Sequence, residues 1–492
     1  MLNRRLFIGS ALASGSFVLP FSRGLAAAQS DAIVPLVRHM LGTSYQALPE
    51  AALRMTRAQL FDTAGIALAA RHEAGVRELR QLGTVTGGKG ESVVWGSKLR
   101  LPAHEAARIN AVMVHALEFD DTFGPGFLHP SAIVYPAALA AADLVGKVNG
   151  QEFLAATTLA NDIACRLSIA GQPGVDGFAI GWHNTTLIGY LSSALVAGRL
   201  MGLNEAQLIN AAGIAAHQAA GNAQSHVDSA LTKRLGPGFA SSAGVLAARL
   251  AQMGLSGPRG VLEGVKGWFS QYHKGIYSRD LLLGGLGQDY PAAETAFKPW
   301  PSCRGSHTSA DAALQLIARH QLTPDQIERI ELRNGPAEWP FLSNPVEAKR
   351  RPRNTVEAQF SIPWVVAAAF TDGWVKIAQF APEALERADI QAMAARITAV
   401  QDNSLANPAG GPGQATIVVT TKDGRRLESH VAAAKGEPQT PMSAEEVQHK
   451  FDDCLEYGGY TRAHGNRLRG VLVEIDRLDE VSRLSRMLGQ EG

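Results

Sequence analysis

The chain has 492 residues, of which 46% are hydrophobic and 18% are charged, with 46 lysines and arginines against 45 acidic residues. This composition is typical of a globular protein with a sizeable core, and the length favours two domains. The nearly neutral charge balance does not favour nucleic acid or an anionic membrane as a partner. Three cysteines are present, at Cys165, Cys303 and Cys454, and they lack metal-ligand spacing and allow one disulfide at most.

The N-terminus is typical of a bacterial export signal. Residues Asn3 to Phe7 resemble a twin-arginine motif, and the apolar run that follows to Phe21 is too short and too interrupted to span a bilayer. Small residues at Ala26 to Ala28 offer a cleavage site. We therefore expect residues 1–28 to be a signal peptide, with a periplasmic mature protein and no stable membrane insertion after cleavage. An uncleaved anchor or a disordered leader is the alternative.

Apolar residues recur at helical spacing from about Asp31 to Gly254, and many of them are alanine or leucine. Alanine-rich faces let helices approach closely, so this region is predicted to be a packed helical domain. Residues Leu231 to Gly238 are predicted to be a loop, because they contain two glycines and a proline. The predicted helices lie at 51–70, 103–119, 130–148, 151–169, 205–221 and 239–253, and another opens within 181–186 and runs to 200.

The composition changes after about Tyr290, where segments with strand-like alternation begin. Strands are predicted at 327–333, 397–400, 415–421 and 426–431, and the last two flank an Asp-Gly turn that predicts a hairpin. Helices at 308–319 and 362–371 lie between them. After Met442 helices return, starting with a capping box at Ser443. The predicted fold class is mainly α, with helical parts at 29–290 and 436–492 and a smaller α+β domain inserted at 291–435.

Reactive side chains are densest between Glu118 and Ser131. If the helix that starts near 103 continues to Thr122, then Glu118, Asp121 and Thr122 share one face and Asp120 points elsewhere. The pattern indicates acid–base or substrate-binding work, although a structural polar cluster is an alternative.

The segment that follows contains Gly-Pro-Gly, which breaks a helix, so His129 is expected in a turn. Pro130 then suits the first turn of the next helix. By residue type a metal site also remains open, formed by His115, Glu118, Asp121 and His129.

Four further places gather reactive residue types. His183 precedes a predicted helix, and Lys233 precedes another, where a small anion can bind or a plain surface charge can lie. The segment from Lys298 to His307 is a rigid turn before a helix, and Arg304 in it is suited to bidentate carboxylate binding. Cys303 as a nucleophile has no adjacent base in the sequence. In the segment that begins at Gln359, Ser361 is interpreted as a helix cap.

Together these elements resemble the 2-methylcitrate dehydratase family, also called MmgE/PrpD, which includes cis-aconitate decarboxylases. The resemblance covers nearly the whole chain from about Asp31 onward, and the order and spacing of the motifs are more specific than any one of them. The motifs are Leu117 to Thr122 with His129 to Ser131, Gly181 to His183, Lys233 with the run at 241–248, Lys298 to Arg304 with His307, and Ala358 to Pro363.

The resemblance implies a large all-helical domain with an inserted α+β lid, a homodimer, and catalysis without a metal or organic cofactor. It also implies a site between the helical domain and the lid. Three departures concern the substrate more than the fold: Glu118 stands where relatives usually carry Asp, the stretch from Gly124 to Leu128 is about one residue longer than in relatives, and Trp364 stands where Tyr is common. By position, the site residues of the family fall on Glu118, Thr122, His129, His183 and Lys233, and its lid contacts on Lys298, Cys303, Arg304 and His307.

From these residues we expect a lyase that removes water from a small di- or tricarboxylic acid. Decarboxylation, isomerisation or epimerisation begins at a similar intermediate, so each is an alternative outcome. A periplasmic carboxylate-binding protein without catalysis and a metal-dependent hydrolase are alternatives of other classes. In the expected site, Lys233, Lys298 and Arg304 bind carboxylates, His129 and His183 are the candidate base and acid, and Glu118 or Asp121 orients an imidazole or stays protonated.

Overall fold

The computed structural model describes residues 30–172, 180–407 and 412–491. The predicted signal peptide at residues 1–28 lies outside this part of the chain. Among the described residues, no helix has both the length and the apolar surface needed to cross a membrane. All three cysteines are free thiols, so the one disulfide that the sequence allowed is not formed.

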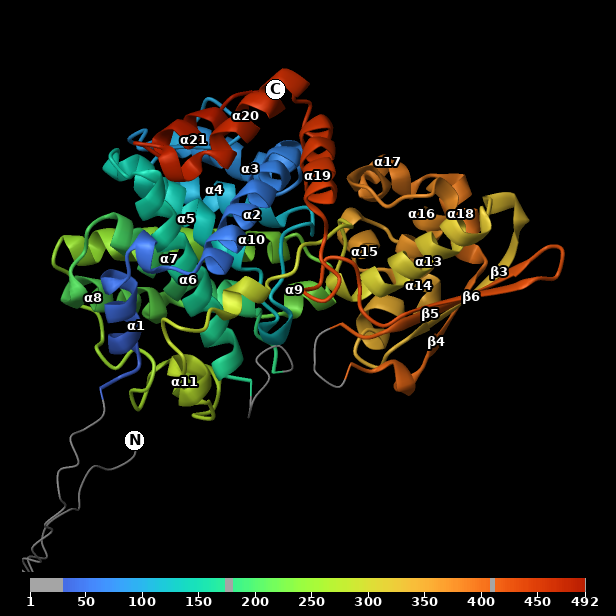
Figure 1. The fold of residues 1–492 in the computed structure, drawn as a ribbon, viewed down its shortest axis with the longest axis horizontal. Helices are drawn as coiled ribbons and strands as arrows, with labels where there is room; N and C mark the ends of the chain where they lie inside the picture. Colours follow the sequence, from blue (N-terminus) through green and yellow to red (C-terminus); the bar gives the residue numbers. More distant parts are fainter. Residues whose placement is uncertain (1–29, 173–179, 408–411, 492) are drawn as a thin grey trace, which may run out of the picture. The chain divides into compact units, whose positions relative to one another are not determined.

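Helices dominate the first half of the chain (Figure 1), which confirms the mainly α prediction. A two-stranded sheet was not predicted and joins β1 (Ser92–Val93) to β2 (Arg100–Leu101). The helices of this half are α1 (Ile33–Gly42), α2 (Glu50–Ala69), α3 (Val76–Thr86), α4 (Ala103–His115), α5 (Pro130–Val145), α6 (Gly150–Ala170), α7 (Asn184–Leu200), α8 (Glu205–Gln218), α9 (Gln224–Val227), α10 (Thr232–Gln252), α11 (Trp268–Tyr272) and α12 (Arg279–Leu283).

The last three helices pack on this half of the chain, and their apolar side chains belong to the same hydrophobic core. Helix α19 lies against α2, where the rings of Phe61 and Phe451 stack with centroids 4.3 Å apart (Figure 1). The predicted capping box is present at Ser443, which accepts a hydrogen bond from the backbone of Glu446. These helices are α19 (Ala444–Tyr457), α20 (Arg462–Val473) and α21 (Ser482–Leu488).

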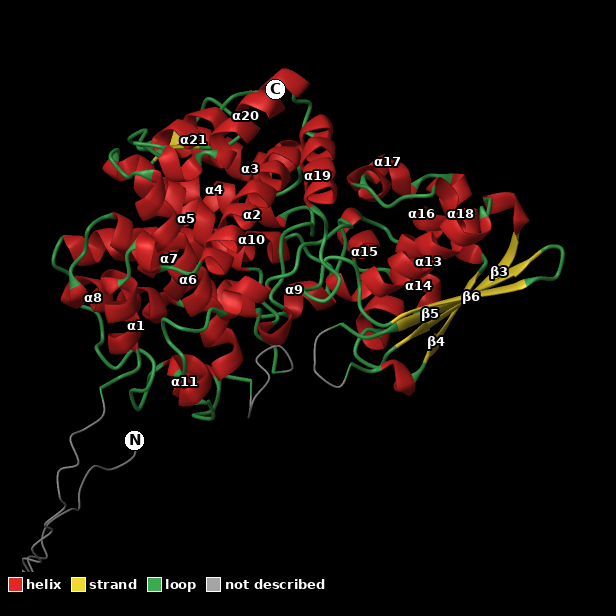
Figure 2. Cartoon of the chain, viewed as in Figure 1, coloured by secondary structure: helices red, strands yellow, loops and turns green. Residues whose placement is uncertain are grey.

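A second hydrophobic core lies between a four-stranded sheet and the helices on one of its faces (Figure 2). The strand order is β4-β3-β5-β6, with β3 and β4 parallel and the other pairs antiparallel. All four predicted strands are confirmed, as is the hairpin. The elements are α13 (His307–His320), β3 (Ile327–Asn334), α14 (Val346–Arg350), α15 (Thr355–Gln359), α16 (Ile362–Asp372), α17 (Pro382–Leu385), α18 (Ala388–Ala395), β4 (Ile397–Gln401), β5 (Ala415–Thr421) and β6 (Arg426–Val431).

The predicted loop before residue 239 is wrong, because α10 already begins at Thr232 and runs through Pro237. The neighbouring glycines serve close helix packing here rather than a turn. A Cβ on Gly236 would lie 2.1 Å from Oγ1 of Thr186, and one on Gly238 would lie 2.7 Å from the backbone oxygen of Arg108. The correction places Lys233 in the first turn of a long, buried helix.

Candidate active site

The segment after α4 decides how the acidic side chains are presented. Helix α4 ends at His115, so the helix predicted over 103–119 is shorter than expected and does not continue to Thr122. Glu118 has a left-handed backbone with φ of +52°, and Thr122 then pairs with Ala296 in an antiparallel bridge. The carboxylates therefore lie on an irregular loop, and helical spacing does not set their directions.

Two buried ammonium groups satisfy the carbonyl groups that follow the end of α4. Lys298 Nζ donates to the backbone oxygen of Glu118 at 2.9 Å, and Lys450 Nζ donates to that of Phe119 at 2.9 Å. The C-terminal end of a helix carries partial negative charge, which nearby cations stabilise. The two lysines therefore stabilise this loop, although the loop also carries acidic side chains. Lys450 is in turn paired with the buried Asp62 at 2.7 Å.

The side chains of Asp120 and Asp121 point to opposite sides of the loop. The sequence predicted that Asp121 would share a face with Glu118 and that Asp120 would point elsewhere, and the structure shows the reverse. Asp120 Oδ2 lies 2.7 Å from Nδ1 of His115, within the group of imidazoles. Asp121 accepts hydrogen bonds from Gln59 Nε2 at 2.8 Å and Ser131 Oγ at 2.7 Å, on the other side of the loop. The neighbouring carboxylates therefore have different partners and different roles.

The charge states of Asp120 and Asp121 also differ, because the two carboxylates have different partners. Burial would raise the pKa of Asp120, but the imidazoles of His115 and His129 outweigh it and hold this pKa below its ordinary value. Burial raises the pKa of Asp121 to about 7, because it faces hydroxyl and amide groups instead of cations. Asp120 is thus an anion at neutral pH, whereas Asp121 is partly protonated.

Glu118 holds two lysines together. Its Oε1 pairs with Lys233 Nζ, and its Oε2 lies 3.6 Å from Lys298 Nζ. Burial acts against the charge of Glu118, but the two ammonium groups outweigh it and keep the pKa of Glu118 well below its ordinary value. Burial lowers the pKa of Lys233, which the Glu118 carboxylate opposes. We call the six residues that meet here the ammonium cluster: His115, Glu118, Asp120, His129, Lys233 and Lys298.

The hydrogen-bond partners fix the tautomers of two histidines. His129 Nδ1 lies 2.8 Å from the backbone oxygen of Asp121, which can only accept, so Nδ1 carries the proton and Nε2 keeps a lone pair. His115 Nδ1 faces the ionised Asp120, and its Nε2 lies 2.8 Å from Lys233 Nζ. The ring proton of His115 is therefore also on Nδ1. Burial lowers the pKa of His129 to about 3, so this ring is neutral at neutral pH.

Two more imidazoles adjoin the cluster. His183 caps α7 with its backbone before Asn184, and its ring centroid lies 5.7 Å from that of His115. His226, on α9, lies 4.8 Å from the His183 ring. Burial lowers the pKa of His183 well below its ordinary value, and that of His226 to about 3. Sequence reasoning did not find His226, because no local pattern distinguishes it.

Thr122 is buried in the same loop, where its backbone nitrogen donates to Ala296 at 2.8 Å. Cys303 has a pKa that burial raises, so the thiol stays protonated and gives no support to a nucleophile. The backbone of Cys303 donates to the Gln359 oxygen at 2.9 Å. These contacts fix the positions of both residues but assign no chemistry to either side chain.

Arg304 forms a separate group whose contacts are internal. It donates from Nε to Glu437 Oε1 at 2.7 Å and from Nη1 to the Lys435 oxygen at 3.0 Å. Nη1 also lies 2.9 Å from His307 Nδ1, which must accept because a guanidinium can only donate. His307 Nε2 then donates to the backbone of Ser302 at 3.3 Å. We call Arg304, His307, Lys435 and Glu437 the arginine group.

A metal site was the open alternative at this place, and its geometry differs from the expectation. Ligand atoms of His115, Asp120 and His129 lie within 4.8 Å of one another, without Glu118 and Asp121. However, both Nδ1 atoms near Asp120 carry protons, and Lys298 and Lys233 bring positive charge to the same place. This donor set suits proton transfer and anion binding better than a cation.

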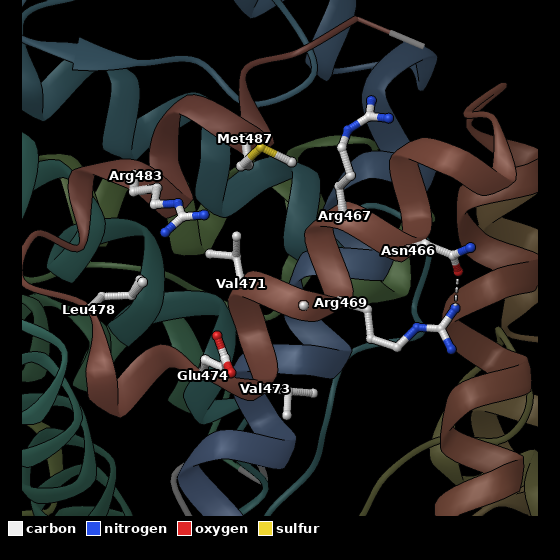
Figure 3. A pocket seen from close by; sticks show the side chains of 10 residues that line it. Asn466, Arg467, Arg469, Val471, Val473, Glu474, Leu478, Arg483 and Met487 are labelled. Atoms are coloured by element: carbon white, nitrogen blue, oxygen red, sulfur yellow. Dashed lines mark hydrogen bonds between the residues drawn. The ribbon is translucent and has the colours of Figure 1, made fainter.

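The ammonium cluster is enclosed, since Lys233 is 4% exposed and Lys298 is 0% exposed. A small cavity is lined by Leu117, Pro301 and Gln359 among others, and none of the cluster residues lines it. A wider groove lies on α20 and α21 (Figure 3), and none of the cluster residues lines it. The residues drawn there include Asn466, Arg467, Arg469, Val471, Arg483 and Met487.

Comparisons with known proteins agree with the sequence motifs. The chain matches the MmgE/PrpD N-terminal domain over residues 35–278 and the MmgE/PrpD C-terminal domain over residues 300–469. Cis-aconitate decarboxylase of Mus musculus is 26% identical over 477 residues, which cover 91% of each chain. The human enzyme of that name is 29% identical over 374 residues, 73% of this chain and 74% of the relative. The Aspergillus terreus one is 26% identical over 413 residues, 80% and 82% of the two chains.

Proposed function

The chain belongs to the MmgE/PrpD family, and from this premise we propose that it is a lyase acting on a small di- or tricarboxylic acid. The reaction begins with removal of a proton from the carbon next to a carboxylate. In the first outcome that we propose, the neighbouring hydroxyl then leaves as water.

The observation that carries this proposal is a neutral imidazole beside two buried ammonium groups. His129 Nε2 has a lone pair that can take the proton, because Nδ1 is occupied by its bond to the backbone. Lys233 and Lys298, which meet at Glu118, can stabilise the negative charge that accumulates on the substrate carboxylate as the C–H bond breaks. Their charges are fixed by the fold and shielded from water, which makes the stabilisation strong.

His129 can complete the reaction with the proton that it has taken. Once protonated, its Nε2 can donate to the departing hydroxyl, so that one imidazole serves first as base and then as acid. His183 is the second candidate acid, since its ring lies near that of His115 inside the same enclosed region. Glu118 holds both ammonium groups in place while the substrate is absent.

Decarboxylation is the second candidate, because the relatives at 26–29% identity are named cis-aconitate decarboxylases. Loss of carbon dioxide leaves a carbanion-like intermediate that needs the same cations and a proton donor. The buried cluster is suited to either outcome.

The test is to incubate the purified mature protein with a panel of hydroxy and unsaturated polycarboxylates and to follow products by NMR. We expect turnover of at least one acid, with water loss or decarboxylation identified by the product. Exchange of a substrate proton in heavy water without product would indicate an epimerase or isomerase. Binding without turnover or exchange would contradict the lyase and support the carboxylate-binding alternative. Activity lost on chelation and recovered with metal would support the metal-dependent hydrolase.

We further propose that the protein is exported to the periplasm, because the N-terminal sequence is typical of a twin-arginine signal. A periplasmic enzyme would process an imported acid. Fractionation of cells that express the full chain would contradict this if the protein stayed cytoplasmic when both arginines were intact. We also propose that the protein is a homodimer, and sedimentation equilibrium would test this oligomeric state.

A further inference from the structure

We propose that Asp120 and His115 are positioning residues that aim the ammonium group of Lys233 at the substrate. They act through a chain of two hydrogen bonds, and neither is required to touch the substrate. The inference rests on the proposed function, because it assigns a reason for the orientation of a charge that the lyase reaction uses.

The geometry is a continuous line of three buried side chains. Asp120 Oδ2 lies 2.7 Å from His115 Nδ1, and His115 Nε2 lies 2.8 Å from Lys233 Nζ. Asp120 is 1% exposed and His115 is fully buried. Asp120 follows His115 in the loop after α4, whereas Lys233 lies in the first turn of α10, so the tertiary structure brings Lys233 to the other two.

Each bond in this line has a defined direction. The carboxylate of Asp120 can only accept, so His115 must donate from Nδ1 and keep its lone pair on Nε2. The Lys233 ammonium can only donate, so it requires that lone pair. Asp120 therefore selects the one neutral tautomer of His115 that can bind Lys233, as the carboxylate of a catalytic triad does for its histidine.

An ammonium group has three N–H donors, and the direction of the third follows from the other two. His115 Nε2 takes one N–H of Lys233, and Glu118 Oε1 takes another. Within the described part of the chain, these are the hydrogen-bond acceptors that meet Lys233 Nζ. The remaining N–H is thereby given a fixed direction, which a transition-state contact needs and which a freely rotating ammonium lacks.

Other charged or titratable groups surround His115 without replacing either bond. His129 and His183 lie with ring centroids 4.9 and 5.7 Å away. Asp120 also lies 3.4 Å from His129 Nδ1, but the proton there is held independently by the Asp121 backbone at 2.8 Å. A change at Asp120 is therefore expected to act mainly through His115.

The test compares three variants that separate the hydrogen bonds from the imidazole. His115→Leu removes both bonds. His115→Gln keeps an amide that can donate to Asp120 and a carbonyl that can accept from Lys233. Asp120→Asn keeps the shape but lets His115 adopt the wrong tautomer. His464→Gln, at a buried histidine of α20, is the matched control for replacing an imidazole elsewhere.

We expect His115→Leu and Asp120→Asn each to lower kcat by about 100-fold with KM changed by no more than about threefold, as for loss of an interaction made in the transition state. His115→Gln should stay within about tenfold of the wild-type kcat, and His464→Gln should leave kcat unchanged. Circular dichroism and thermal melts verify that each variant is folded.

Two results would overturn the inference. One is a folded His115→Gln as inactive as His115→Leu, which would show that the imidazole itself is needed for proton transfer. The other is wild-type kcat in both His115→Leu and Asp120→Asn. Lys233→Ala, measured in parallel, separates the two proposals. If the wild-type protein turns over no acid of the panel, the proposed function is wrong; if it does and Lys233→Ala alone loses turnover, only the positioning role is wrong.

Discussion

The ammonium cluster and the arginine group contain similar cations, yet their contacts give them different capacities. In the arginine group, Nε and Nη1 of Arg304 donate to Glu437, the Lys435 backbone and His307, and Nη2 makes an ion-pair contact with Glu437 at 2.6 Å without a hydrogen bond. In the ammonium cluster, one carboxylate, Glu118, is shared by two lysines. A cation is available to a substrate only where the protein has not already satisfied its donors. This favours the lysines, rather than Arg304, as the groups that bind the carboxylates.

The largest expected effect is on turnover, at the cluster. His129→Ala and Lys233→Ala should each lower kcat by at least ~100-fold, because they remove the proton acceptor and a charge that stabilises the intermediate. Steady-state kinetics on the acid identified by the NMR screen would measure this. Lys98→Ala, at a lysine whose side chain is 85% exposed, is the control. Near-wild-type rates in both site variants would contradict the assignment.

The next largest effect is expected on stability, at the ion pair between Lys450 and Asp62. Lys450→Met leaves the buried Asp62 without its ion pair, so we expect the free energy of unfolding to fall by about 3 kcal/mol. Urea denaturation would measure the loss. Adding Asp62→Asn should restore part of it, since an uncompensated charge is then no longer buried. Additive losses in the double variant would show that the two side chains do not interact.

The third effect is on the pH dependence of stability. His129 stays neutral in the folded protein down to about pH 3, whereas the unfolded chain takes up this proton below 6.5, so its contribution falls as the pH falls through that window. Asp121 stays protonated when folded up to about pH 7, whereas the unfolded chain ionises above 3.8. Its contribution is therefore lost as the pH rises from 3.8 to 7.

His129 and Asp121 thus change the free energy of unfolding with pH in opposite directions, and each contributes at most about 1.4 kcal/mol per pH unit. Relative to wild type, His129→Gln should lose stability as the pH rises from 4 to 6.5, and Asp121→Asn should gain it. Urea denaturation at several pH values measures both trends. Parallel profiles for the two variants would contradict the opposite charge states.

The smallest effect is expected at the arginine group. Arg304→Gln should change kcat and KM by no more than about threefold, because the guanidinium of Arg304 binds within the protein. Glu437→Gln is the matched control, because it removes the same ion pair. If Arg304→Gln alone raised KM tenfold or more, Arg304 would bind the substrate, as the sequence first suggested.

Features with local causes could be predicted from the sequence. Strands β5 and β6 were placed to the residue, since alternating apolar positions and an Asp-Gly turn are properties of the segment itself. Four of the six cluster residues, Glu118, His129, Lys233 and Lys298, were predicted by type and motif and lie together, whereas Asp120 was expected to point elsewhere. Residue types in order along the chain thus indicated which chemistry to expect.

The tertiary structure decided how those residues are used. Whether Asp120 or Asp121 enters the cluster depends on where α4 ends, and that is set by Thr122 pairing with Ala296 and by lysines far along the chain. The start of α10 depends on glycines that fit against other helices, and His226 reaches the site only by folding. Sequence fixes the titratable groups, but burial and partners from distant segments set their protons and directions, because electrostatic interactions act through space and not along the chain.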